Sequence, residues 1–136
     1  MRIATWNING IKARLPLVQA WLKGSAPDAA VLQELKSTDE TFPREAIEEC
    51  GYSIETHGQK SFNGVAILSK NGIEDVTRGL AGDDDDAQAR WIEGTLIGDE
   101  GAVRLCGLYL PNGNPAPGPK YDYKLAWMER MEARVE

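Results

Sequence analysis

The stretch Ala29-Ala30-Val31-Leu32-Gln33-Glu34 decides the expected fold. Its run of apolar residues predicts a buried strand, which ends abruptly at an amide and a carboxyl side chain. Before it, Arg2–Ile8 alternate in the manner of a strand, and Leu15–Lys23 have apolar residues at helical spacing. After it, a short helix is expected around Arg44–Cys50. Strand, helix, strand and helix in this order indicate an α/β domain.

The second part of the chain is richer in expected strands, which turn-forming residues separate. These strands are Tyr52–His57, Gly64–Ser69, Arg90–Ile97 and Val103–Leu110. From about Asp122, apolar residues recur at helical spacing up to the end of the sequence, and no glycine or asparagine ends this helix. We therefore expect residues 1–136 to be a partial domain that is truncated at its C-terminal end.

Composition and charge narrow the class of protein. The 136 residues are 42% hydrophobic, enough for one compact domain, and no apolar run approaches the roughly 20 residues of a membrane span. The first residues lack the pattern of a secretory signal. Cys50 and Cys106 lie far apart in no metal-ligand spacing, so we expect two reduced, mostly buried thiols in a cytoplasmic protein. A net charge of −6 argues against a protein that coats DNA, but not against one that cuts it.

Polar side chains stand at or near the carboxyl ends of expected strands, namely Asn7, Glu34 and Tyr109. Ligands of layered α/β folds bind near this edge of the sheet, so these side chains converge if their strands are neighbours. An amide and a carboxylate suit a hard cation such as Mg²⁺ or Mn²⁺, and a phenol can orient a phosphate. The pattern alone favours plainer roles: a solvated glutamate, a turn-capping asparagine and a core tyrosine.

Several segments, in order across nearly the whole chain, resemble the exonuclease III family of bacterial apurinic/apyrimidinic endonucleases, within the endonuclease/exonuclease/phosphatase superfamily. The segments are Trp6–Arg14, Leu32–Lys36, His57–Lys60, Gly64–Lys70, Gly82–Arg90 and Gly107–Gly113. The Leu-Gln-Glu match is shared across the superfamily. The acidic run that ends in Gln88-Ala89-Arg90 and the stretch Tyr109–Gly113 narrow the resemblance to the DNA-repair branch.

The resemblance implies roles for individual residues. Glu34 would be a direct carboxylate ligand of the metal, and Asn7 would either bind the metal or orient an acidic group. Tyr109 would be a catalytic phenol beside the scissile phosphate. Asn112 would donate a hydrogen bond to a phosphate oxygen, and Arg90 would contact the DNA.

The resemblance also implies a fold and a function. The fold would be the N-terminal half of a four-layered, DNase I-like α/β sandwich, whose later half supplies an Asp-x-Asn motif and an Asp-His pair that do not occur here. The whole protein would be a monomeric Mg²⁺-dependent nuclease of base excision repair. It would act on double-stranded DNA as a 3′-5′ exonuclease and at abasic sites. We expect the present chain to be inactive alone and to expose apolar surface that favours association.

Other polar residues receive less specific interpretations. Asp83–Asp86 are expected in a solvated loop, and His57 does not match the catalytic histidine of the family. Leu35 stands where the family usually has a threonine, which either loosens the ligand shell or is a neutral packing change. Some basic residues could line a DNA groove, although solvated surface charges are the better interpretation; these are Lys12, Arg14, Lys36 and Lys60.

Two alternatives remain open from the sequence. The same scaffold serves phosphatases that act on lipid or inositol phosphates, against which Gln88-Ala89-Arg90 and Asn112 argue. A short non-catalytic protein that binds nucleic acid or a partner is the other, against which the uncapped last helix argues.

Overall fold

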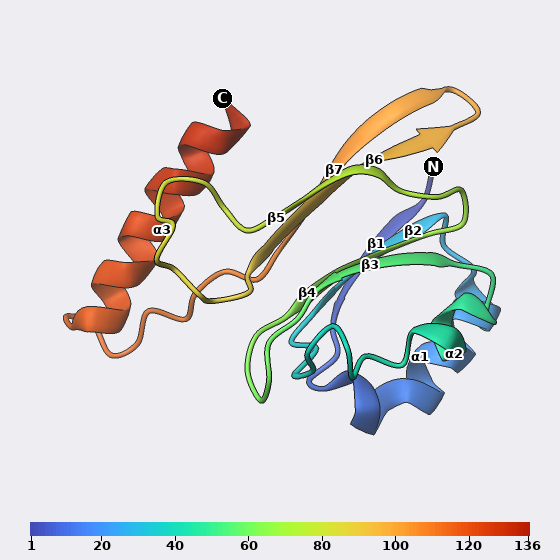
Figure 1. Cartoon of the computed structure of the whole chain (residues 1–136), viewed down its shortest axis with the longest axis horizontal. Helices are drawn as coiled ribbons and strands as arrows, with labels where there is room; N and C mark the ends of the chain where they lie inside the picture. Colours follow the sequence, from blue (N-terminus) through green and yellow to red (C-terminus); the bar gives the residue numbers. More distant parts are fainter.

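The computed structural model describes residues 1–136 and contains two β-sheets that pack face to face, with helices outside them (Figure 1). In chain order the elements are β1 (Ile3–Asn7), α1 (Ile11–Ser25), β2 (Ala29–Gln33), α2 (Arg44–Glu48), β3 (Ser53–His57), β4 (Val65–Ser69), β5 (Glu74–Arg78), β6 (Trp91–Gly98), β7 (Gly101–Leu108) and α3 (Pro119–Val135). Sheet A has the strand order β1-β2-β4-β3, and sheet B has the order β5-β6-β7. Helices α1 and α2 cover the outer side of sheet A, and α3 packs on the outer side of sheet B at one end. The predicted layered α/β fold is confirmed.

Strands β1 and β2 run parallel, with Asn7 opposite Gln33. Helix α1 makes the crossover between them, as a parallel pair requires. Both strands therefore end at the same edge of sheet A. Two of the predicted site residues, Asn7 and Glu34, lie at this edge.

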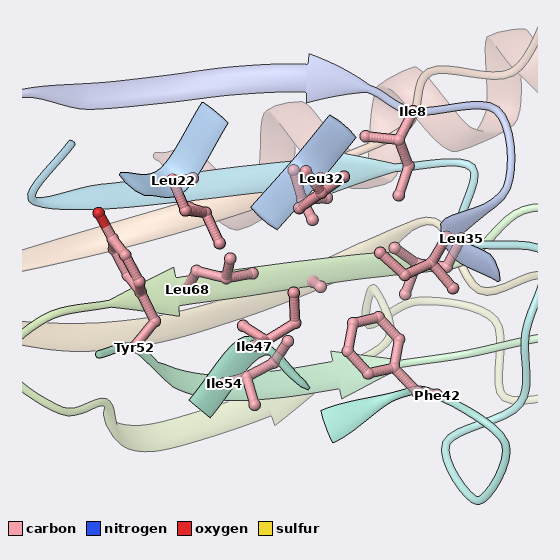
Figure 2. Close-up of a cluster of buried hydrophobic side chains, with 13 residues drawn as sticks. Ile8, Leu22, Leu32, Leu35, Phe42, Ile47, Tyr52, Ile54 and Leu68 are labelled. Carbon is pink, nitrogen blue, oxygen red and sulfur yellow. The ribbon is translucent and has the colours of Figure 1, made fainter. Parts of the chain in front are cut away.

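The largest core cluster lies between sheet A and its two helices (Figure 2). Leu32 and Leu68 of the sheet pack there against Leu22 of α1 and Ile47 of α2. The opposite face of sheet A packs on sheet B through a second cluster, which includes Ala29, Val65, Ile67, Ile92 and Leu96. Because β2 is covered on both faces, its sequence is continuously apolar rather than alternating.

Helix α3 is attached through a separate apolar cluster. Trp127 of α3 meets Trp91 of β6 edge to face, with ring centroids 6.2 Å apart, and both side chains are buried beside Leu80. Edge-to-face pairs of this kind contribute about 0.5–1.5 kcal/mol beyond the area that they bury. The last helix is therefore a packed part of the fold.

The structure differs from the sequence expectations in a few elements. Helix α1 begins at Ile11, so Pro16 lies inside the helix rather than in its first turn, and α3 begins at Pro119. Strand β5 was not predicted, because Glu74–Arg78 is a short, mostly exposed edge strand with charged residues and little apolar alternation. None of the helices has the length and apolar character needed to cross a membrane.

Candidate active site

The backbone at the end of β2 holds Glu34 in a left-handed conformation, with a φ of 54°. Its carbonyl accepts the N–H of Gly10 at 2.7 Å, and the N–H of Leu35 donates to the carbonyl of Gly64 at 3.3 Å. A non-glycine residue in this conformation costs about 1–2 kcal/mol, which the flanking hydrogen bonds help to offset. The position of the Glu34 side chain is thus determined by the loop after β1 and by the residues before β4.

The Glu34 carboxylate joins the other two candidate residues at the edge of sheet A. Its Oε1 accepts a hydrogen bond from Asn7 Nδ2 at 3.2 Å and another from the Tyr109 hydroxyl. Lys36 Nζ lies 3.8 Å from Glu34 Oε2. Tyr109 directly follows β7, so it reaches Glu34 from the second sheet. The predicted convergence of the three strand ends is therefore present, although one of them belongs to sheet B.

These contacts set the charge states of the pair. The hydrogen bond from Tyr109 lowers the pKa of the Glu34 carboxyl, with help from Asn7, Lys36 and Arg90, and outweighs the opposing effect of burial. Burial raises the pKa of Tyr109, and the bond to Glu34 raises it further. At neutral pH Glu34 is ionised and Tyr109 is a protonated hydrogen-bond donor.

Asn7 uses both ends of its amide within the chain. Nδ2 donates to Glu34, and Oδ1 accepts the N–H of Asn9 at 3.1 Å. Lys36 Nζ donates to Asn9 Oδ1 at 2.6 Å, which fixes the same turn. In this arrangement Asn7 orients the Glu34 carboxylate. Of the two roles that the resemblance left open, the geometry favours the orienting one.

The donor set fits a hard cation held in part by other groups. Nowhere in the chain do three or more His, Cys, Asp or Glu side chains gather in a manner suited to a metal ion. Mg²⁺ usually keeps several waters and is bound by one or two carboxylates together with substrate phosphates. An ionised, oriented and partly exposed glutamate is compatible with that mode of binding.

Arg90 and Asn112 lie beside this cluster. The Arg90 guanidinium is 4.9 Å from the centre of the Tyr109 ring, and its Nη1 donates to the Tyr109 carbonyl at 3.1 Å. Asn112 is exposed and lines, with Arg90 and Lys120, a pocket of about 330 Å³. The side chains that line this pocket include two cations and no carboxylate, so it suits an anionic group such as a phosphate.

One interpretation from the sequence is wrong in part. Asp83, Asp84 and Asp85 are exposed as expected, but the Asp86 side chain is only 6% exposed and pairs with Arg130 at 2.9 Å. The sequence had no local signal for this pair, because Arg130 lies 44 residues away on α3. Gln88 and Tyr123, which also contact this region, were missed as site-supporting residues for the same reason.

Of the remaining candidates, Lys36 lies beside Glu34, whereas His57 lies apart from the cluster. His57 ends β3, lines a different pocket and forms no hydrogen bond to Glu34; burial lowers its pKa. Leu35 is buried in the core beside Phe42 and Ile8 (Figure 2), so the packing interpretation of this position is favoured. Lys12, Lys36 and Lys60 are exposed, and Arg14 is half-buried.

Comparisons with known proteins point to one family. Residues 4–136 match the Endonuclease/Exonuclease/phosphatase family. The chain is 39% identical over 113 residues to exodeoxyribonuclease III of Haemophilus influenzae, covering 83% of this chain and 42% of that protein. It superposes on the 3′ phosphatase NExo from Neisseria, solved with a product DNA hairpin, with a TM-score of 0.93 and 41% identity over 99% of this chain and 51% of that one.

An AP endonuclease from Archaeoglobus fulgidus is also similar, with a TM-score of 0.89 and 37% identity over 96% of this chain and 49% of that one. The chain therefore spans about half the length of the relatives that it matches.

Proposed function

The chain belongs to the endonuclease/exonuclease/phosphatase family, and from this premise we propose that residues 1–136 form part of the domain of a DNA repair nuclease of the exonuclease III type. Its reaction would be Mg²⁺-dependent hydrolysis of phosphodiester bonds at abasic sites and at 3′ ends of double-stranded DNA. The relatives named exodeoxyribonuclease III and AP endonuclease, and the relative bound to a DNA hairpin, support this substrate class. The whole protein would act as a monomer.

The observation that carries the proposal is the Asn7–Glu34–Tyr109 cluster. It joins an ionised carboxylate, an orienting amide and a protonated phenol at the edge where both sheets end. The ion pair of Glu34 with Lys36 is long, at 3.8 Å, and the closer partners of the carboxylate are the neutral donors Asn7 and Tyr109. Such a carboxylate keeps its negative charge available for a cation.

Each residue of the cluster has a proposed role. Glu34 holds Mg²⁺, or Mn²⁺ in its place, and Asn7 and Tyr109 orient the carboxylate. When bound, the ion supplies charge stabilisation to a phosphoryl oxygen. Tyr109 lies next to Arg90 and can contact a phosphate that occupies the neighbouring pocket, where Arg90 and Asn112 donate hydrogen bonds to its oxygens.

We also propose that the present chain has no useful nuclease activity alone. The site contains one carboxylate, and no other acidic side chain or histidine contacts it. Positioned acid–base groups contribute about 10²- to 10⁴-fold to rate, and the family resemblance assigns them to the later half of the whole protein.

We further propose that the protein is located in the cytoplasm. Its two free, half-buried cysteines are compatible with that reducing compartment.

The test is incision of a DNA duplex that carries an abasic site, with Mg²⁺, by the chain alone and by the chain mixed with the separately made second half of an exonuclease III relative. We expect incision only in the mixture. Glu34→Ala should reduce that rate by at least about 100-fold, as expected for loss of a group that supports charge stabilisation. Glu40→Ala, an exposed glutamate outside the cluster, is the matched control. Equal rates for Glu34→Ala and the unchanged chain would overturn the assignment.

A second candidate function is removal of a 3′ phosphate from DNA, because one close structural relative is named a 3′ phosphatase. A substrate panel in the same mixture separates the possibilities: an abasic duplex, a 3′-phosphate duplex and an inositol phosphate. Hydrolysis of the inositol phosphate alone would favour the lipid or inositol phosphatases. Binding of DNA without hydrolysis of any substrate would favour the non-catalytic alternative.

A further inference from the structure

Arg90 lies beside two aromatic rings that come from different parts of the fold. Its guanidinium carbon lies 4.9 Å from the centre of the Tyr109 ring and 5.9 Å from that of Tyr123 on α3. Its Nε donates to Gln88 Oε1 at 2.7 Å, and its Nη1 donates to the Tyr109 carbonyl. Its Nη2 forms no hydrogen bond within the chain. Arg90 is therefore constrained by two neighbouring rings and two hydrogen bonds, while one nitrogen stays available to a ligand.

The second layer of this arrangement is built around Asp86. Its Oδ2 accepts the Tyr123 hydroxyl at 2.7 Å and Arg130 Nη1 at 2.9 Å, and its Oδ1 accepts the backbone N–H of Gln88 at 3.0 Å. Arg130 also donates to the carbonyls of Leu80 and Ala81. Asp86 thus contacts two of the three residues that touch Arg90, namely Gln88 and Tyr123.

The charge states favour a stable arrangement. Burial alone raises the pKa of Asp86, but hydrogen bonds from Arg130, Gln88 and Tyr123 outweigh it and lower the pKa overall. Burial and the bond to Asp86 raise the pKa of Tyr123, so its hydroxyl remains a donor. A nearly buried ion pair adds little net stability compared with apolar side chains of the same size. Its position behind Arg90 suggests a role in geometry.

We propose that Asp86 and Tyr123 are positioning residues that hold the Arg90 guanidinium beside Tyr109, ready to receive a DNA phosphate. The inference rests on the proposed function, because it assigns these residues to the same phosphate-binding pocket. Arginine has about 2 kcal/mol of side-chain rotamer entropy, and a guanidinium that is ordered before binding loses less of it on contact with DNA. Loss of the support should therefore weaken substrate binding more than it slows the chemical step.

The first experiment observes Arg90 directly in the ¹⁵N-labelled chain. The Nε–H signal of Arg90, assigned by its disappearance in Arg90→Lys, should be shifted by the two rings and protected from exchange with water. In Tyr123→Leu and Asp86→Asn we expect the signal to move to the position of a solvated arginine, because the bond from Arg90 Nε to Gln88 Oε1 would no longer be held in place. The Nε–H should then exchange at least about tenfold faster, since loss of that bond, about 1.4 kcal/mol, corresponds to this factor. Asp84→Asn, an exposed residue of the same loop, is the matched control.

Conservative variants separate positioning from general loss of structure. Tyr123→Phe keeps the ring but removes the bond to Asp86, so we expect a smaller shift than in Tyr123→Leu. The backbone amides of sheet A should be unchanged in every variant, because only α3 and the loop before β6 contact Asp86. An unchanged Arg90 signal in both Tyr123→Leu and Asp86→Asn would overturn the proposal.

The second experiment measures incision of a DNA duplex that carries an abasic site by the chain mixed with the second half of an exonuclease III relative. Tyr123→Leu should raise KM by at least about fivefold and change kcat less than about twofold, as expected for lost binding that is equal in ground and transition states. A fall in kcat with unchanged KM would overturn the positioning role. An altered Arg90 signal in a mixture that cuts no DNA would instead contradict the proposed function and leave the positioning of Arg90 standing.

Discussion

At the scale of single residues, Glu93 shows how one buried carboxylate joins distant elements. The residue is 1% exposed and accepts hydrogen bonds from Trp91 Nε1 at 3.0 Å and Arg104 Nε at 2.9 Å, together with two from Arg134. Arg104 lies on β7 and Arg134 on the last turn of α3. Burial raises the pKa of Glu93, but the three donors outweigh it and lower the pKa overall. The charged form is therefore part of the folded structure.

This arrangement predicts a dependence of stability on pH. Because the pKa of Glu93 is lower in the folded than in the unfolded chain, its contribution is present above the unfolded value of about 4.3 and is lost as the pH falls through the folded value. Glu93→Gln should lower the free energy of unfolding by about 2 kcal/mol at pH 7. The difference from the unchanged chain should shrink on acidification toward pH 3, as measured by urea denaturation. Glu100→Gln, at an exposed turn, is the control; a difference that grows at low pH would contradict the assignment.

At the scale of elements, the contact between the end of β2 and the start of β4 determines the position of the Glu34 side chain. Gly64, just before β4, has a φ of +95°, and a Cβ there would lie 2.9 Å from Leu35 Cβ. Its carbonyl accepts the Leu35 N–H. A glycine is required here both by the left-handed backbone and by the close approach of Leu35. Because Leu35 directly follows Glu34, its packing in the core also fixes the backbone from which the Glu34 side chain extends.

Gly64→Ala should therefore destabilise the fold by about 3 kcal/mol, the sum of left-handed strain and overpacking. Gly51→Ala is the matched control, since Gly51 has a similar φ of +91° but a Cβ added there would meet no atom within 4 Å. We expect about 1 kcal/mol for the control. Equal losses for the two variants in urea denaturation would show that the contact with Leu35 does not matter.

At the scale of the whole molecule, each sheet has a free edge on the same side. β7 packs over β2 and β4, while β1 lies beyond β2 at the edge of sheet A. The exposed apolar residues along these edges include Ile3, 44% exposed, and Val103, 39% exposed. The inner faces of the two sheets pack on each other, so the expected exposed apolar surface includes these unpaired edges rather than an inner sheet face.

Open strand edges predict association at high concentration. The unchanged chain should show a weight-average mass that rises with concentration in sedimentation equilibrium, and Val103→Lys should lower that rise by placing a charge on the β7 edge. Leu17→Lys is the control, because Leu17 is an exposed apolar residue of helix α1 and not of an edge strand. A constant monomer mass for the unchanged chain would contradict this expectation.

The sequence by itself determined the α/β class, most strands and the family. Apolar alternation in Arg2–Ile8 and the continuous apolar run at Ala29–Leu32 are local patterns, so they could be interpreted without knowledge of the fold. The candidate residues Asn7, Glu34 and Tyr109 followed from strand ends and from the family resemblance. Strand β5 was not predicted, because an exposed edge strand lacks an apolar pattern of this kind.

Only the tertiary structure decided which strands pair, which side chains meet and which charges are buried. In sequence Asp86 does not differ from its exposed neighbours, and its burial follows from contacts with Arg130 and Tyr123 of α3. The Arg90 guanidinium is constrained because Tyr109, directly after β7, and Tyr123 of α3 lie beside it in the folded chain. The physical reason is that these contacts join residues far apart in the chain, and their energies depend on burial and distance, which no local pattern contains.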